Sequence, residues 1–266
     1  MENLQKKIQI LLSLYKLKNF SKAEMFNKEL LRAHPNIVFL YNTLGLIFTE
    51  QNRLDEAISI YNTGIKIQSD YAMIYNNLGT VYKIKNDFKK AKNYYKKCIK
   101  LDKKIPEPYN NLGSLFLSQG MYSKAINFFK EAIKRNPKFF PSHYNLGTVY
   151  INTGKYEDAK KHLEVSIELN PYLYPAHRNL SSLIKYSKDN DHFKLLMRLY
   201  DDNKNNNEQN AELAFTLGKA FDDVKDFKKA FKYLKIGNNI RRRDVIFSLD
   251  AEKKFFKELK KKDLNW

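Results

Sequence analysis

Asparagine side chains recur at a fixed interval along this sequence, and an amide is well suited to reading a peptide backbone. Each amide offers both a donor and an acceptor, so a column of them can pair with an extended peptide whatever its side chains are. The asparagines that lie 34 residues apart are Asn77, Asn111, Asn145 and Asn179. Thr43 occupies the same position one repeat before Asn77. The residues that directly precede Thr43 and the four asparagines are Asn42, Asn76, Asn110, Tyr144 and Arg178. These positions are the predicted peptide-binding residues.

A compositional interpretation stands beside the functional one. Asparagine, lysine, isoleucine, tyrosine and phenylalanine are all frequent in this chain, and they share codons rich in A and T. A genome of low GC content would therefore place asparagines in many permissive positions without any role in binding. The sequence alone leaves both interpretations open.

Residues that could catalyse a reaction or hold a metal are few. His143 and His177 occupy equivalent positions, which are tyrosine in the three preceding repeats, and this predicts packed core residues. The neighbouring equivalents Tyr109 and Ala214 supply no further metal ligand. Cys98 is the one cysteine, in a position held elsewhere by small residues. It is expected to be buried, and a single cysteine excludes an intrachain disulfide and fits a reducing cytoplasm. We expect no metal and no cofactor.

The glycines also argue against an enzyme. Five of the nine follow a leucine, two lie in connecting turns and two fill a small position of a second helix, so none is left for a phosphate-binding loop. No G-x-x-x-x-G-K-[ST], G-x-G-x-x-G, G-x-S-x-G or H-E-x-x-H pattern occurs. We therefore predict a non-catalytic protein.

The elements that must position these side chains form a 34-residue repeat. Leucine-glycine pairs start at Leu44, Leu78, Leu112 and Leu146, and an alanine follows each glycine by twelve residues, at Ala57, Ala91, Ala125 and Ala159. Large apolar residues recur at helical spacing in both halves of the unit, which predicts two amphipathic helices. The turn between the halves carries Asn52, Asn86, Gly120 and Gly154, residue types that tolerate a left-handed backbone.

This spacing resembles the tetratricopeptide repeat. The resemblance implies an all-α, right-handed superhelical solenoid of antiparallel helix pairs, whose first helices line a concave groove. It also places the asparagines on that groove, where Asn77, Asn111, Asn145 and Asn179 are similar to the asparagine ladder of O-linked N-acetylglucosamine transferase. The predicted organisation is a five-unit array over 1–173 with a weak first unit, a degenerate repeat with a hinge loop at 201–207 over 174–210, a last repeat over 211–244, and a capping helix over 245–266.

Charge has two interpretations. The chain holds 48 Lys and Arg against 29 Asp and Glu, a net charge of +19, and residues 83–104 and 225–262 carry most of the excess. The lysines of the first block fall on a second helix of a repeat, and a solvent-exposed outer face would account for their number. The alternative is that these Lys-rich faces bind nucleic acid or another polyanion. Lysine dominates over the arginine that favours bidentate phosphate contacts, so nucleic acid is not the expected partner. The lysine-flanked N-terminus predicts an amphipathic helix and no membrane contact.

A narrower resemblance concerns the C-terminal third. Residues 176–243 are similar to the region that precedes the catalytic domain in bacterial tetratricopeptide-sulfotransferase fusion proteins, whose P-R-S-G-T-type loop is not found in this sequence. The predicted function is thus a cytoplasmic scaffold that binds a protein or an extended peptide in its groove. The alternative is the substrate-recruiting arm of a truncated or split sulfotransferase.

Overall fold

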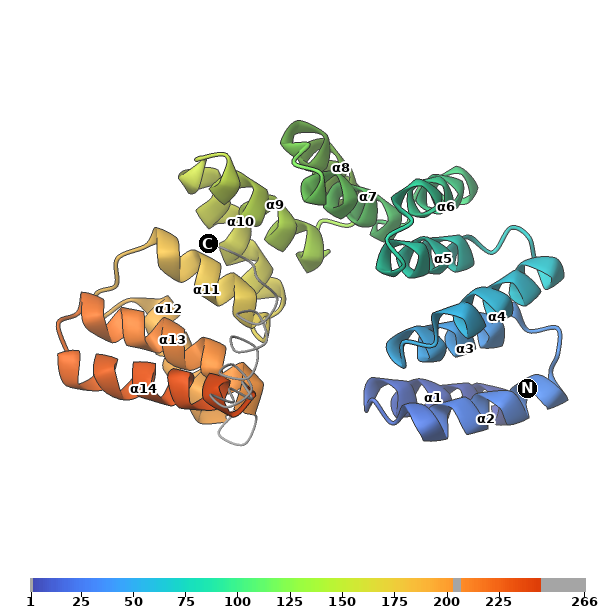
Figure 1. Cartoon of the computed structure of the whole chain (residues 1–266), viewed down its shortest axis with the longest axis horizontal. Helices are drawn as coiled ribbons and strands as arrows, with labels where there is room; N and C mark the ends of the chain where they lie inside the picture. Colours follow the sequence, from blue (N-terminus) through green and yellow to red (C-terminus); the bar gives the residue numbers. More distant parts are fainter. Residues whose placement is uncertain (1, 203–206, 245–266) are drawn as a thin grey trace, which may run out of the picture. The chain divides into compact units, whose positions relative to one another are not determined.

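The computed structural model describes residues 2–202 and 207–244, and within these ranges every regular element is an α-helix (Figure 1). The all-α prediction is confirmed. The chain divides into two compact units, Met1–His162 and Leu163–Trp266, and the boundary falls inside one helix. The predicted capping helix lies outside the described residues, and so do residues 203–206 of the predicted hinge loop. Among the described helices, none is long and apolar enough to span a membrane.

Helix pairs follow one another along the chain. The first ten helices are α1 (Glu2–Lys16), α2 (Phe20–Ala33), α3 (Val38–Glu50), α4 (Leu54–Ile67), α5 (Ala72–Ile84), α6 (Phe88–Leu101), α7 (Glu107–Ser118), α8 (Tyr122–Arg135), α9 (Phe140–Asn152) and α10 (Tyr156–Leu169). The last four are α11 (Tyr174–Leu183), α12 (Asp191–Asp202), α13 (Asn207–Asp223) and α14 (Phe227–Asp244). From α1 to α9 each helix packs against the next, which is the pattern of a solenoid of helix pairs.

Left-handed residues close the turns within the pairs. The predicted positions have positive φ: +59° at Asn52 and Asn86, +70° at Gly120 and +72° at Gly154. The next residue's N–H bonds back to the carbonyl five residues earlier, as in Arg53 N to Phe48 O at 2.8 Å. This is the Schellman arrangement, which satisfies a carbonyl left open at the helix end. Lys18 and Lys225 take the same conformation, with φ of +56° and +62°, at positions that residue type did not reveal.

The leucine-glycine positions mark where the two helices of a pair meet. A Cβ added at Gly113 would lie 2.5 Å from the ring of Phe129, and at Gly79 it would lie 2.5 Å from the ring of Tyr95. Both rings are fully buried. The absence of a side chain on the first helix therefore makes room for an aromatic ring from the second.

The second unit departs from the regular repeat. Here the first helix, α11, has 10 residues, whereas α3, α5, α7 and α9 have 12 or 13. The second helix, α12, has 12 residues, whereas α4 and α6 have 14. Residues 184–190 connect α11 and α12, and α13 holds this connection in place. Asp223 accepts a 2.9 Å hydrogen bond from the backbone of Tyr186, and Lys219 donates to the carbonyl of Ile184. The second helix of this repeat is two residues shorter than its equivalents in the first unit.

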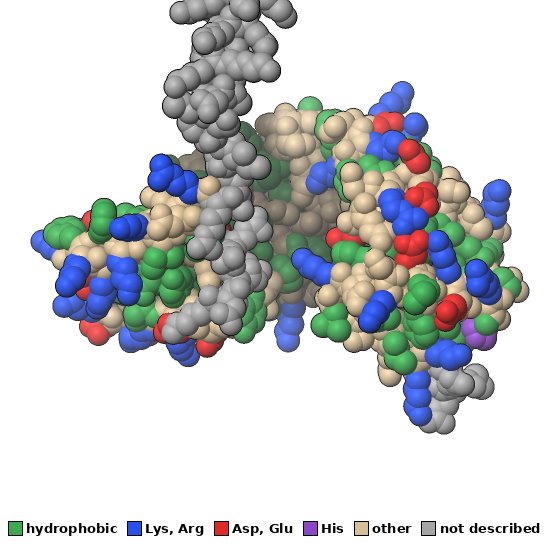
Figure 2. Space-filling view, turned by 60° about the horizontal axis from the view of Figure 1, so that its bottom comes forward, with side chains coloured by type: hydrophobic (Ala, Val, Ile, Leu, Met, Phe, Trp, Pro, Cys, Tyr) green, Lys and Arg blue, Asp and Glu red, His purple; other side chains and the backbone are tan. Residues whose placement is uncertain are grey.

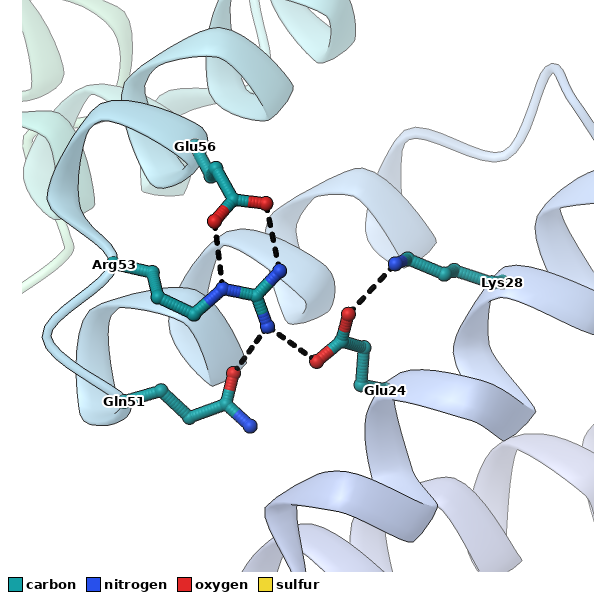
Figure 3. Close-up of polar contacts among 5 residues, drawn as sticks. All are labelled: Glu24, Lys28, Gln51, Arg53 and Glu56. Atoms are coloured by element: carbon teal, nitrogen blue, oxygen red, sulfur yellow. Dashed lines mark hydrogen bonds and ion pairs between the residues drawn. The ribbon is translucent and has the colours of Figure 1, made fainter.

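An ion-pair network joins α2 to the turn before α4 (Figure 3). Arg53 makes two bonds to Glu56, at 2.6 and 2.7 Å, and one to Glu24 at 2.5 Å, while Lys28 lies 2.6 Å from the other oxygen of Glu24. The guanidinium also lies 4.2 Å from the centre of the Phe48 ring. Burial raises the pKa of Glu24, but the bonds from Arg53 and Lys28 outweigh it and lower that pKa. The network thus fastens the first helix pair to the second.

Replacing Arg53 by alanine should loosen this junction by about 1 kcal/mol, because a shared guanidinium in a network is worth more than an isolated surface pair. Amide hydrogen exchange of α1 and α2 measures the effect, which should shrink in high salt. Lys85→Ala is the control, since Lys85 makes one pair, at 2.7 Å, with the exposed Asp55. Equal effects of the two substitutions would contradict the assigned role.

Candidate functional site

Six of the predicted binding residues lie on successive first helices of the first unit. We call them the asparagine row: Asn42 on α3, Asn76 and Asn77 on α5, Asn110 and Asn111 on α7, and Asn145 on α9. Each lies one or two residues before a leucine-glycine pair, so the close helix packing at the glycine fixes the position of its backbone. The repeat thereby presents one amide after another along the same face of the first helices.

The row is internally hydrogen-bonded from repeat to repeat. In each case the amide nitrogen of one residue donates to the amide oxygen of the asparagine 35 residues earlier. These bonds run from Asn77 to Asn42 at 2.8 Å, from Asn111 to Asn76 at 3.0 Å and from Asn145 to Asn110 at 2.9 Å. Each bond crosses from one helix pair to the next, and the spacing of 35, one more than the repeat, means that it joins the residue just before one leucine-glycine pair to the residue two before the preceding pair. The row therefore links the repeats to each other.

Asn76 and Asn77 are the most fully engaged members. Asn76 Nδ2 donates to Asn77 Oδ1 at 3.2 Å, so each of the two uses both its oxygen and its nitrogen inside the protein. Their exposed fractions are 5% and 7%, and that of Asn42 is 6%. These side chains were predicted to face a ligand, and in the structure their amides pair with one another.

The row is interrupted between Asn110 and Asn111. Asn110 Oδ1 accepts from Asn145 and from Ser142 Oγ at 3.0 Å, and Asn111 Nδ2 donates to Asn76. No hydrogen bond within the described residues uses Asn110 Nδ2 or Asn111 Oδ1. Asn111 is half-buried and Asn110 is 9% exposed. One donor and one acceptor on adjacent residues thus remain available, and a single peptide group needs that combination.

The other predicted residues have different surroundings. Tyr144 on α9 is half-buried, and Asn179 and Arg178 lie on α11 in the second unit. Arg178 is exposed and lies 3.2 Å from the Glu212 carboxylate, which Arg241 also contacts at 2.7 Å. Arg178 thus belongs to an ion-pair cluster of the second unit.

His143 and His177 are packed core residues, as predicted, with exposed fractions of 7% and 0%. Each ring lies within hydrogen-bond distance of the carbonyl six residues earlier: His143 Nε2 to Pro137 O at 3.0 Å and His177 Nε2 to Pro171 O at 2.8 Å. In an earlier repeat the Tyr75 hydroxyl donates to the equivalent carbonyl at 2.8 Å. Histidine therefore does the same capping as tyrosine in this position.

Each of these histidines has a second histidine against it, which the sequence did not reveal. His143 and His162 lie 3.1 Å apart between Nδ1 atoms, and His177 Nδ1 lies 2.8 Å from His192 Nε2. Burial and, to a smaller extent, the facing histidine lower the pKa of His162 to about 4 and that of His192 to about 3. The pairs are therefore neutral near pH 7. Among the described residues, no group of three or more side chains could hold a metal ion.

The remaining candidates have structural surroundings. Cys98 is fully buried, and burial raises the pKa of its thiol to about 12, so it is a packing residue as predicted. On α6 most of the lysines are exposed, and three of them lie over aromatic rings, including Lys92, which lies 5.6 Å from the centre of the Phe116 ring. Lys97 lies 4.3 Å from the centre of the Tyr75 ring and Lys90 lies 5.0 Å from that of Tyr82. This agrees with a solvated face that shields the rings beneath it.

Comparisons with known proteins agree with the repeat. Family models described as tetratricopeptide repeats match residues 72–105, 106–139 and 128–161, and one described as a TPR repeat matches 45–84. Among solved structures, the APC/C hetero-tetramer Cut9-Hcn1 matches with a TM-score of 0.62 at 17% identity, covering 87% of this chain and 42% of that one. Pseudomonas aeruginosa pilF matches with a TM-score of 0.58 at 22% identity, covering 83% and 97%.

No curated protein matches the sequence significantly. At these identities the structural likenesses show the fold alone, and the resemblance of 176–243 to sulfotransferase fusions stays a prediction. Family matches, helix pairs, left-handed turns and the glycine contacts agree with each other over 45–161. Residues 45–161 are therefore built of tetratricopeptide repeats, within an all-α array of helix pairs.

Proposed function

We propose that the first unit binds an extended segment of a partner protein along the asparagine row, and that Asn110 and Asn111 make the central contact to its backbone. The observation that supports this is the interruption of the row at these two residues. Amide-to-amide bonds connect Asn111, Asn76, Asn77 and Asn42 in one series, and another connects Asn145 to Asn110. The link between Asn110 and Asn111 is missing, so one donor and one acceptor remain there.

The proposed contact consists of two hydrogen bonds to the backbone of the bound segment. Asn110 Nδ2 donates to a carbonyl of the segment, and Asn111 Oδ1 accepts from a neighbouring N–H. Because Ser142 and Asn145 already hold the Asn110 oxygen, its amide plane is set before the segment arrives, and little side-chain entropy is lost on binding. Recognition through the backbone tolerates many side chains. A buried, unreactive Cys98 suits a reducing cytoplasm as the place of binding.

Asn110→Asp is the sharpest test. Aspartate keeps the oxygen that accepts from Ser142 and Asn145 but removes the Nδ2 donor, so the fold stays intact while the proposed contact is lost. A 12-residue peptide selected on the wild-type chain from a random phage-displayed library serves as the probe. Its affinity, measured by fluorescence anisotropy, should fall at least tenfold, with the melting temperature changed by no more than a few degrees.

Asn77→Asp is the matched control, since it makes the same substitution in the preceding repeat at a residue whose Nδ2 and Oδ1 are both bonded within the protein. Asn77 Nδ2 donates to Asn42, so this variant should lower the free energy of unfolding by about 1 kcal/mol and leave the peptide affinity close to wild type. Peptides methylated at single backbone nitrogens locate the N–H that Asn111 accepts. Unchanged affinity in Asn110→Asp, or no sensitivity to backbone methylation, would contradict the proposal.

The resemblance of residues 176–243 to sulfotransferase fusions favours a second form of this function. In that form the array recruits a substrate protein to a sulfotransferase made as a separate chain. The DNA just downstream of the coding sequence tests it. A reading frame with a P-R-S-G-T-type loop is the expected finding, and a neighbourhood without one counts against this form while leaving peptide binding in place.

A further inference from the structure

A cavity of about 710 Å³ opens on the second unit, where α12, α13 and the start of α14 meet. Its volume lies within the range of pockets that accept small molecules or single peptide side chains. The asparagine row belongs to the first unit and takes no part in it. Figure 2 shows hydrophobic side chains beside lysine and arginine on the part of the molecule that contains α13 and α14, at the left.

The floor of the cavity is apolar. Phe193 of α12 and Phe221 of α13 form it, with their ring centres 4.9 Å apart in an edge-to-face arrangement and exposed fractions of 3% and 6%. Met197 and Val224 extend this floor, and Phe227, which is 64% exposed, stands at its border. A large apolar side chain entering here would leave water and contact aromatic and thioether groups.

The rim is positively charged. Lys188, Lys225, Lys228 and Lys229 line the cavity, and all four are exposed. The one acidic residue of the lining, Asp226, is occupied, because it lies 3.3 Å from Lys229 Nζ and also caps α14 by accepting from the Lys229 backbone. No described carboxylate forms an ion pair with Lys188, Lys225 or Lys228. Three ammonium groups therefore surround an apolar floor without an ion-pair partner among the described residues. Lys188 interacts only at longer range with Asp226, whose pKa is lowered mainly by its bonds from Lys229 and slightly by the charge of Lys188.

The departure of this repeat from the regular pattern creates the cavity. In the first unit, three residues such as 51–53 join the two helices of a pair, whereas residues 184–190 join α11 to α12 and carry Lys188 to the rim. Lys225 occupies the left-handed turn position that asparagine or glycine fills in four other repeats. A lysine costs about 1 kcal/mol there, so its charge at the rim comes at the expense of local stability.

We propose that this pocket binds a partner peptide in which large apolar side chains are flanked by aspartate or glutamate. The apolar group lies on Phe193 and Phe221, and the flanking carboxylates pair with Lys188, Lys225 and Lys228. Charge complementarity selects this occupant. Residues 245–266 of the chain itself hold six lysines against four acidic residues, so they bring the wrong net charge to a lysine rim.

The fluorescein-labelled peptide GDEFLDEG is the probe, titrated with the full chain at 50 mM salt and followed by anisotropy. Saturable binding is expected, at least tenfold weaker for GDESSDEG, which lacks the apolar pair, and absent for GKKFLKKG. The double variant Lys188→Glu/Lys228→Glu should weaken binding at least tenfold. Lys225→Asn should weaken it about threefold while raising the melting temperature, because asparagine suits the left-handed turn.

Lys96→Glu/Lys100→Glu on α6 is the control, since it changes the net charge by the same amount on an exposed face of the first unit. It should change the affinity less than twofold. Binding that both double variants weaken equally, or binding that does not distinguish GDEFLDEG from GDESSDEG, would show a general attraction of the basic chain for acidic peptides and overturn the pocket. Failure of the wild-type chain to bind GDEFLDEG would overturn it as well.

Discussion

Replacing Gly113 by alanine should lower the free energy of unfolding by about 3 kcal/mol, because the new methyl group would overpack the core. In an ordinary helix interior the same change stabilises by about 1 kcal/mol, because alanine is the better helix former. At Gly113 we expect the opposite effect on the free energy of unfolding. The new Cβ would lie 2.5 Å from Cε1 and 2.6 Å from Cδ1 of Phe129, a fully buried ring that has nowhere to move. The two helices of the repeat must separate instead.

Urea unfolding measures the loss, and amide hydrogen exchange shows whether it starts at α7 and α8 and reaches the neighbouring repeats, as expected for a linear array. Gly120→Ala is the control. Its Cβ meets nothing within 4 Å, so only the positive φ of +70° opposes it, at about 1 kcal/mol. In a Phe129→Val background the ring atoms are gone, and Gly113→Ala should cost far less. An equal cost in both backgrounds would mean that contact with the ring is not the cause.

The repeat was predictable from sequence because packing and backbone conformation allow few residue types at each of its characteristic positions. A glycine opposite an aromatic ring, an alanine at a helix crossing and an asparagine or glycine in a turn each allow few alternatives, so their spacing determines helices and turns together. Lys18 and Lys225 show the limit of this reasoning. Tertiary packing imposes the left-handed turn on them although lysine does not favour it, and only the position in the repeat could have indicated it.

The candidate site was predictable only in its location. Residue type shows that an asparagine can donate and accept hydrogen bonds, but it does not identify the partners. Two columns of asparagines at spacing 34 suggested seven similar amides facing a ligand. The bonds instead run at spacing 35 between Asn77 and Asn42 and their equivalents, so most of the row is satisfied internally. Ser142, which holds Asn110, gave no signal, because a serine outside the row has no distinctive spacing.

The two histidine pairs should make the protein lose stability in mild acid. The ordinary pKa of histidine is about 6.5, and burial lowers that of His162 to about 4 and that of His192 to about 3. Between pH 6.5 and 4 the unfolded chain therefore binds protons that the folded chain does not. The free energy of unfolding is highest above pH 6.5 and falls as the pH is lowered. Each pair should contribute a loss of about 3 kcal/mol by pH 4, at about 1.4 kcal/mol per pKa unit.

The hydrogen bonds explain why neither ring accepts a proton easily. In the second unit the Tyr186 hydroxyl donates to His192 Nδ1 at 2.9 Å, His192 Nε2 donates to His177 Nδ1 at 2.8 Å, and His177 Nε2 donates to the Pro171 carbonyl. Every ring nitrogen has a partner when both rings are neutral. A proton added to either histidine removes one acceptor from this chain of bonds and places a charge in a stack whose ring centres are 5.0 Å apart.

The chain itself supplies the control for the first unit. Tyr75 and Tyr94 occupy the positions equivalent to His143 and His162, and their rings stack with centres 6.4 Å apart. His143→Tyr/His162→Tyr therefore keeps an aromatic pair and the bond to the Pro137 carbonyl while removing both titrating groups. Urea unfolding at pH 7, 6, 5 and 4, with amide exchange to separate the units, should show that the variant loses about 3 kcal/mol less than wild type, with the difference confined to the first unit.

The pH interval separates the histidines from the carboxylates. Carboxylates such as Glu24, whose pKa is lowered, titrate below about pH 4.5, so a loss of stability between pH 6.5 and 5 comes from the histidines. Parallel losses in variant and wild type over that interval would show that the pair does not set the acid sensitivity.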